Sequence, residues 1–242
     1  MGRSLVLGAV LALVAPAGAA PPGGDLAVRQ ALHAASVIVE PSGCGGALAE
    51  TPTLVVTAKH CIDKRELSVR FVTGAWREAR LVATDDVAEQ VVLMLDDPVP
   101  IMPLAVVHRR QIPGAVLYFE GNPKNPRFQT VRLERIGTCP SLPDLPNALF
   151  TSLQGTPGDS GSPIVDGAAR IVGLVHGGAQ CQIATPSDTL ARLVDRVLEH
   201  DQRLAGSGVD RLAHGRTTVT ARCASPVSSK AAPSCSTTRS NP

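Results

Sequence analysis

Two short segments carry residue types that could together perform nucleophilic catalysis. One places Ser160 in a glycine-rich turn over residues 158–161, and the other places His60 directly before Cys61. A serine hydroxyl is a poor nucleophile at neutral pH and needs a neighbouring base, which in turn needs a third group to fix its tautomer. The glycines allow a tight turn that exposes Ser160 and turns backbone N–H groups inward, so the N–H groups of Gly158 and Ser160 are the candidate oxyanion donors. The residues indicate acyl transfer with Ser160 as nucleophile and His60 as general base.

Both segments resemble the motifs of the trypsin/chymotrypsin family of serine peptidases. That family carries Thr-Ala-Ala-His-Cys, which the chain matches over residues 57–61 except for Lys59. It also carries Gly-Asp-Ser-Gly-Gly-Pro, which the chain matches over residues 158–163 except for Ser162. The resemblance runs from about Ser36 to Leu198 and implies two six-stranded barrels with the active site between them. It also implies hydrolysis of a protein or peptide substrate without a metal or organic cofactor.

The third member of the expected triad is less clearly marked than the other two. The family has an aspartate at the start of a strand, and the corresponding strand here is Val91–Leu95. An alignment without gaps places Glu89 at the aspartate's position, whereas Asp86 would require a three-residue shift. We favour Glu89, because a glutamate can also accept a hydrogen bond from the imidazole and stabilise its cation. Asp86 remains the alternative.

The resemblance also suggests where a substrate pocket lies. His176 falls where many relatives have a serine that contacts the catalytic acid, so we expect it to support Glu89 or to line the pocket. The floor position is a neutral glutamine, which gives no support for cleavage after Arg or Lys. The expected pocket residues are Gln154, Val175, His176, Gly177 and Gly178.

Six cysteines in an exported chain are typical of disulfide bonds, and the absence of any Cys-x-x-Cys pair argues against a zinc site. A Cys44–Cys61 bond would hold the turn that carries His60. The family's cysteine four residues before the nucleophile is Thr156 here, which leaves Cys139 as the expected partner of Cys181. The pairing of the last two, Cys223 and Cys235, stays open.

The activation route also stays open at this stage. The chain has no Ile-Val-Gly-Gly start of the kind that zymogen cleavage releases in animal enzymes. Asp159 could still receive a new N-terminus, as it does in those enzymes, or it could be satisfied by local backbone donors.

The elements that must position these residues are mostly short strands. Gln129–Ile136 alternates apolar and polar residues, and six other runs are rich in β-branched residues: Val37–Val39, Leu54–Val56, Val69–Val72, Val91–Leu95, Val116–Phe119 and Ile171–Val175. Many short strands separated by turn signals indicate a barrel or a sandwich. We therefore predict an all-β, two-barrel chymotrypsin-like fold with a C-terminal helix.

The proline-rich stretch Asp97–Pro113 could join the two barrels, which we place at residues 36–100 and 101–184. An apolar stripe at helical spacing predicts a helix over 185–204, with Thr185 as its cap and Pro186 in its first turn. The polar remainder, 205–242, has the composition of a flexible tail.

The N-terminus indicates export. Residues 1–19 have a positive start, an apolar run too short to span a bilayer and a small-x-small end, which together are typical of a signal peptide. Residues 20–35 form an N-terminal segment or a short propeptide. We expect a secreted or periplasmic monomer without stable membrane insertion, and the formal charge of +2 does not favour a nucleic-acid partner.

Two other functions compete with the peptidase. A catalytically silent pseudopeptidase could use the same fold to bind a protein. This alternative arises because Glu89 replaces the aspartate that the family has in its triad. An esterase of the α/β-hydrolase type is disfavoured, because it needs Gly-x-Ser-x-Gly and a histidine that follows the serine.

Overall fold

The computed structural model describes residues 24–62, 66–140, 143–145, 147–177 and 181–214. The expected signal peptide, Gly178, Cys223 and Cys235 lie outside the described residues. In chain order the elements are α1 (Gly24–Ala35), β1 (Ser36–Glu40), β2 (Cys44–Leu48), β3 (Leu54–Ala58), the 3₁₀ turn η1 (Lys59–Cys61), β4 (Leu67–Phe71), β5 (Trp76–Asp85), β6 (Gln90–Leu95), β7 (Val116–Phe119), β8 (Gln129–Gly137), β9 (Ala148–Thr151), β10 (Pro163–Val165), β11 (Ile171–Gly177), β12 (Gln182–Pro186) and α2 (Ser187–His214).

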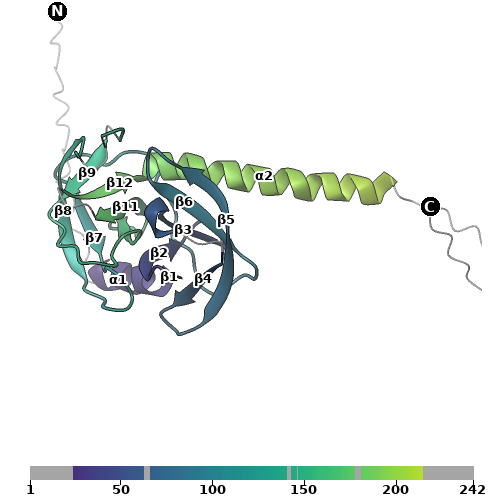
Figure 1. Ribbon diagram of the computed structural model, residues 1–242, viewed down its shortest axis with the longest axis horizontal. Helices are drawn as coiled ribbons and strands as arrows, with labels where there is room; N and C mark the ends of the chain where they lie inside the picture. The colour runs from purple at the N-terminus through teal and green to yellow at the C-terminus, as the bar shows by residue number, and fades with distance from the viewer. Residues whose placement is uncertain (1–23, 63–65, 141–142, 146, 178–180, 215–242) are drawn as a thin grey trace, which may run out of the picture. The chain divides into compact units, whose positions relative to one another are not determined.

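The strands close into two antiparallel barrels, which confirms the predicted fold class (Figure 1). The first barrel has the order β1-β2-β3-β6-β5-β4, and the second has the order β10-β11-β12-β9-β8-β7. Closure leaves each strand hydrogen-bonded on both sides, so neither barrel has a free edge.

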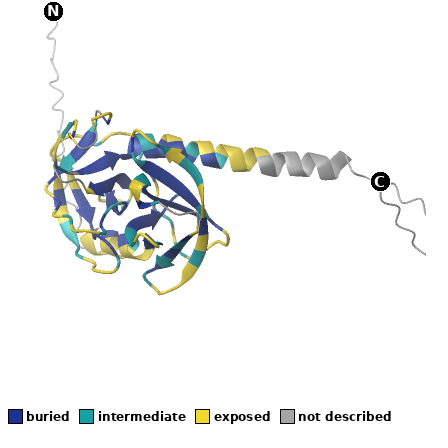
Figure 2. Ribbon diagram, in the orientation of Figure 1, coloured by how far each residue is buried: buried dark blue, intermediate teal, exposed yellow. Residues whose placement is uncertain are grey.

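Buried apolar side chains fill both barrels. Much of the strand backbone is accordingly dark blue, the colour of buried residues, in Figure 2. The second barrel has its own apolar cluster, built around Phe119, Leu133 and Ile164. The larger cluster contains residues of the first barrel, such as Val56 and Phe71, together with residues of both helices. Aromatic residues make up only 2% of the chain, so branched aliphatic side chains supply most of this burial.

The segment between β6 and β7 contacts both barrels. Leu104 forms a parallel bridge with Ala49 beside the first barrel, and Val106 forms one with Ile171 of the second. The Val106 N–H also donates to the carboxylate of Glu50. The segment is therefore fixed by hydrogen bonds and holds the two barrels together.

The N-terminal segment begins the described structure as α1, whose apolar face is buried through Val28 and Leu32. The helix runs directly into β1 and also contacts β7 of the second barrel. Residues 24–35 are thus part of the packed fold.

The C-terminal helix begins and ends later than the sequence predicted. Thr185 and Pro186 pair with Leu174 and Gly173 of β11 and therefore belong to β12, so the expected cap was wrong. Helix α2 starts at Ser187 and continues through residues 205–214, which we had assigned to the tail. The described residues up to Asp201 form one compact unit, and Gln202 begins a second. Within the described residues, no helix has the length and apolar character needed to cross a bilayer.

Candidate active site

His60 lies just after β3 of the first barrel. β3 ends at Ala58, and the chain turns into η1, which contains His60 and Cys61. Cys61 is bonded to Cys44 at the start of β2, with 5.9 Å between the Cα atoms, as predicted. The disulfide fixes the turn, and it leaves the His60 side chain 38% exposed and accessible to a substrate.

Glu89 is the acid that lies beside His60. Its Oε2 accepts from the backbone N–H of His60 at 3.2 Å and lies 3.3 Å from Nδ1 of the same ring. The Glu89 carbonyl accepts from the Lys59 N–H at 2.8 Å. Asp86, by contrast, pairs with the Lys59 ammonium at 2.9 Å, and its side chain is 73% exposed. Of the two predicted acids, the structure brings only Glu89 to the imidazole.

His176 of β11 approaches the same carboxylate from the second barrel. Its Nε2 lies 3.8 Å from Glu89 Oε2, and its ring meets the His60 ring edge-on with 4.7 Å between centroids. Burial lowers the pKa of His176, and the neighbouring His60 lowers it further, while Glu89 opposes this shift. His176 is therefore neutral at pH 7 and can contact Glu89 without neutralising its charge.

The loop before β10 presents Ser160 to the first barrel. Gly158 and Gly161 have φ angles of +95° and +81°, values that glycine adopts readily. The Gly45 N–H lies 3.0 Å from the Gly158 carbonyl and 2.9 Å from that of Ser160, which ties the loop to β2. The Ser160 carbonyl also lies 3.8 Å from the sulfur of Cys61. Base and nucleophile thus belong to neighbouring segments of different barrels.

Three polar groups of the Ser160 loop have no acceptor among the described residues. They are the N–H groups of Gly158 and Ser160, which we predicted as oxyanion donors, and the Ser160 hydroxyl. Free N–H groups are what an oxyanion site requires before substrate arrives. Hydrogen bonds between catalytic groups are often long in a free enzyme and shorten only when substrate binds.

The two barrels approach so closely here that neither side tolerates a side chain. A Cβ at Gly161 would overlap the hydroxyl of Thr57, and a Cβ at Gly45 would overlap the hydroxyl of Ser162. Within the first barrel, the Thr57 hydroxyl donates to the Gly45 carbonyl at 2.7 Å, beside this contact. The contact between the barrels therefore depends on glycine at both positions.

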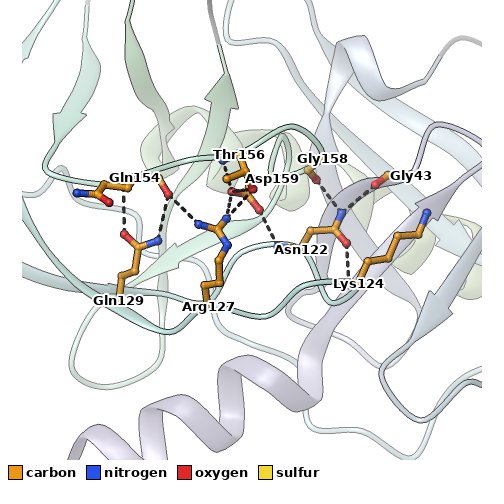
Figure 3. A network of polar contacts seen from close by, with 9 residues as sticks. All are labelled: Gly43, Asn122, Lys124, Arg127, Gln129, Gln154, Thr156, Gly158 and Asp159. Carbon is orange, nitrogen blue, oxygen red and sulfur yellow. Dashed lines mark hydrogen bonds and ion pairs between the residues drawn. The ribbon is translucent and has the colours of Figure 1, made fainter.

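Asp159, the residue before the nucleophile, is buried and fully paired (Figure 3). Its carboxylate forms an ion pair with Arg127 and accepts from the N–H groups of Asn122 at 2.9 Å and Thr156 at 2.6 Å. The sequence left two partners open for Asp159, a newly released N-terminus or local backbone donors. The structure has a local donor, the Thr156 N–H, and adds the Asn122 N–H and Arg127.

Asn122 extends this network to the first barrel, and neither its role nor that of Arg127 was predicted from the sequence. The Asn122 amide donates to the carbonyls of Gly43 and Gly158 at 2.8 and 2.7 Å (Figure 3). Both residues come from the turn-rich segment between β7 and β8, where no motif or spacing marks them. The network fixes the conformation of the loop that carries Ser160.

Gln90, next to Glu89, is a third residue that the sequence did not single out. Its side chain is fully buried, and its amide donates to the Thr185 hydroxyl at 2.8 Å and to the Pro186 carbonyl at 2.9 Å. Its carbonyl oxygen accepts from Thr189 at 2.8 Å. The start of β6 is thereby attached to the junction of β12 and α2.

The predicted pocket residues differ in how they relate to Ser160. A Cβ at Gly177 would lie 3.5 Å from the Ser160 hydroxyl, so this backbone borders the nucleophile. Val175 packs in the apolar cluster of the second barrel, and its carbonyl accepts from the Gly161 N–H at 2.8 Å. Gln154 is exposed, and its carbonyl accepts from Arg127 and Gln129, each at 3.1 Å.

The second predicted disulfide, Cys139–Cys181, is also present, with 6.3 Å between the Cα atoms. Both cysteines belong to a small apolar cluster that contains Ala88 and Ile183. Ala88 directly precedes Glu89, so this disulfide of the second barrel supports the turn that carries the acid.

Comparison with known proteins agrees with this arrangement. The family model described as "Trypsin-like peptidase domain" matches residues 35–174, more than half of the chain. The chain therefore belongs to the trypsin-like peptidase family. The matched residues contain His60, Glu89 and Ser160 and end just before His176. A search of curated proteins finds no match.

Two solved structures share the fold at low sequence identity. The Rv3671c protease in its inactive form is 18% identical, with a TM-score of 0.58, and the match covers 75% of this chain and 98% of that protein. Deg5 is also 18% identical, with a TM-score of 0.57, and the match covers 70% of this chain and 91% of Deg5. At this identity the likeness supports the two-barrel fold alone.

Proposed function

We propose that the chain is an exported serine endopeptidase that hydrolyses peptide bonds through an acyl-enzyme. Ser160 attacks the scissile carbonyl while His60 takes its proton, and His60 later protonates the leaving amine. Glu89 orients His60 and stabilises the imidazolium that forms. The observation that carries this proposal is the contact of Glu89 Oε2 with both the backbone N–H and Nδ1 of His60.

The Gly158 and Ser160 N–H groups serve as the oxyanion hole in this proposal. One such donor typically contributes about 10²–10³ to the rate. His176 acts as a positioning residue, because its ring lies against both His60 and Glu89 and limits their movement.

The proposed enzyme needs no cleavage of its N-terminus to become active. In the animal enzymes of this family, the aspartate before the nucleophile receives the N-terminus that cleavage releases. Asp159 already has Arg127 and two backbone N–H groups, so a newly released amine would have no vacant acceptor.

Fluorophosphonate labelling of the purified protein tests the proposal, with wild type beside Ser160→Ala. We expect wild type to react and Ser160→Ala to be unreactive, because only an activated serine attacks the probe. Ser162→Ala provides the matched control, since it removes a neighbouring hydroxyl and leaves Ser160 in place. A folded, disulfide-bonded wild type that does not react would favour the pseudopeptidase.

Export is the second part of the proposal. Two disulfides in the described fold suit an oxidising compartment, and the N-terminal sequence has the features of a signal peptide. N-terminal sequencing of the protein recovered from outside the cytoplasm should begin after Ala19. An uncleaved N-terminus on cytoplasmic protein would contradict this part.

A further inference from the structure

Three potential metal ligands meet in the active site. One ring nitrogen each of His60 and His176 and one carboxylate oxygen of Glu89 all lie within 4.8 Å of one another. Glu89 Oε2 is 3.3 Å from His60 Nδ1 and 3.8 Å from His176 Nε2. Donor atoms held ~2.0–2.2 Å from a tetrahedral zinc ion are themselves about 3.3–3.5 Å apart. Small side-chain rotations would therefore bring all three into coordination.

The chemistry of this set favours zinc over the hard cations. Two imidazoles and one carboxylate form a His₂Glu set, which leaves a fourth position for water, whereas Ca²⁺ and Mg²⁺ prefer oxygen ligands. Cys44 and Cys61 lie close to His60, but their sulfurs are bonded to each other and supply no thiolate.

The site is open on one side and closed on the other. The His60 side chain is 38% exposed and that of Glu89 is 20% exposed, so an ion can enter from solvent. The His176 side chain is 11% exposed and forms the inner wall. His176 is also the residue that departs from the serine of many relatives, and a serine there would leave only two of the three ligands.

We propose that this chain binds Zn²⁺ through His60, Glu89 and His176, and that the ion reversibly inhibits the peptidase. An ion on His60 Nδ1 would separate this nitrogen from the Glu89 carboxylate and leave the ring proton on Nε2, the nitrogen that must accept the serine proton, so binding and catalysis are mutually exclusive. Binding is coordination alone: the single proton of each neutral imidazole stays on the nitrogen that does not bind the ion, and only a second proton on a charged ring is released to solvent. The inhibition rests on the proposed function, whereas the binding does not.

Calorimetric titration of ZnCl₂ into the tag-free full chain at pH 7.5 tests the binding. We expect one ion per chain in wild type and in Ser160→Ala, which keeps all three ligands. His176→Ala and Glu89→Gln should each weaken binding about tenfold or more, because each removes or neutralises a ligand. His108→Ala is the matched control, since His108 is a surface histidine 3.7 Å from Asp195. Melting temperatures verify that each variant is folded.

The rate of fluorophosphonate labelling tests the inhibition separately. Zn²⁺ should slow labelling of wild type, EDTA should restore it, and His176→Ala should require about tenfold more Zn²⁺ for the same effect. Failure of wild type to bind Zn²⁺, or equal binding by wild type and His176→Ala, would overturn the site. A third outcome is possible: wild type binds one Zn²⁺ ion through His176 but does not react with the fluorophosphonate even in EDTA. This result would support the metal site and refute both the peptidase and its inhibition by zinc.

Discussion

At the scale of single residues, the conformation of Glu89 is the least ordinary feature of the active site. Its φ of +55° lies in the left-handed region, which costs a residue other than glycine on the order of 1 kcal/mol. The carbonyl of this residue binds the Lys59 N–H, and its carboxylate binds His60, so both of its polar groups face η1. The backbone strain thus coincides with the contact that the proposed mechanism needs.

Glu89→Gln should lower kcat by about 10³–10⁴-fold, because an amide can donate to Nδ1 and select the wrong tautomer of His60. Steady-state hydrolysis of a peptide substrate measures this effect. Asp86→Asn is the matched control and should change kcat by less than a few fold, since the Asp86 side chain is 73% exposed and pairs with the Lys59 ammonium instead of the imidazole. Similar losses in the two variants would mean that Glu89 is not the triad acid.

At the scale of elements, the loop that carries Ser160 is held from two directions. The segment between β7 and β8 supplies Arg127 and Asn122, and β2 supplies the N–H of Gly45. These contacts come from both barrels, so the geometry of the oxyanion donors depends on how the barrels are joined.

Arg127→Met should lower the free energy of unfolding by about 3 kcal/mol, because it leaves the buried Asp159 carboxylate without its ion-pair partner. This value is the lower end for a broken buried pair, since two backbone N–H groups still donate to Asp159. It should also lower kcat, since the loop loses a support. Urea unfolding and peptide hydrolysis report the two effects. Arg132→Met, which removes an exposed arginine of β8, should stay within about 0.5 kcal/mol of wild type. Equal effects of both changes would argue against the pair's structural role.

Gly45→Ala should cost about 1–3 kcal/mol or more, because the new methyl group overlaps the Ser162 side chain. Adding Ser162→Gly should recover most of the loss, since it removes the atoms that collide. Urea unfolding of the two single variants and the double variant gives the coupling energy. Additive effects would show that the two residues do not meet as described.

At the scale of the whole molecule, α1 connects the two barrels. It leads directly into β1 of the first barrel, while the Tyr118 hydroxyl of β7 donates to Asp25 at 2.7 Å. Glu120, just after β7, contacts Nδ1 of His33 at 3.1 Å. Loss of the helix would therefore loosen both barrels.

The pH dependence of stability should show the effect of Glu120. Burial raises the pKa of Glu120 above its ordinary 4.5, against the opposing effects of His33 and Arg29. The folded protein then holds this proton more tightly than the unfolded chain, so ionisation of Glu120 reduces stability as pH rises from about 4.5 through the folded-state pKa. Urea unfolding across this range should show a smaller decline for Glu120→Gln than for wild type. Parallel curves would exclude the effect.

Local sequence was sufficient for seven of the twelve described strands and for two of the active-site residues. Alternating or β-branched runs predicted those strands, the family resemblance implied the two barrels, and the residues around His60 and Ser160 form contiguous motifs. The start of α2 could not be predicted locally, because Thr185 and Pro186 have the chemistry of a helix cap but pair with β11. The partner of Asp159 was equally hidden, since Arg127 lies far away in sequence and only the closed second barrel brings it near.

Each of the two disulfides lies close to one of the two proposed catalytic residues of the first barrel, His60 and Glu89. Cys61 follows His60 in the chain, and Cys139–Cys181 packs in the cluster that contains Ala88, the neighbour of Glu89. In the reducing interior of the producing cell neither bond would form, so base and acid would both lack their covalent support. The proposed peptidase would therefore stay inactive towards the cell's own proteins until export, because the bonds that support its base and acid form only in an oxidising compartment.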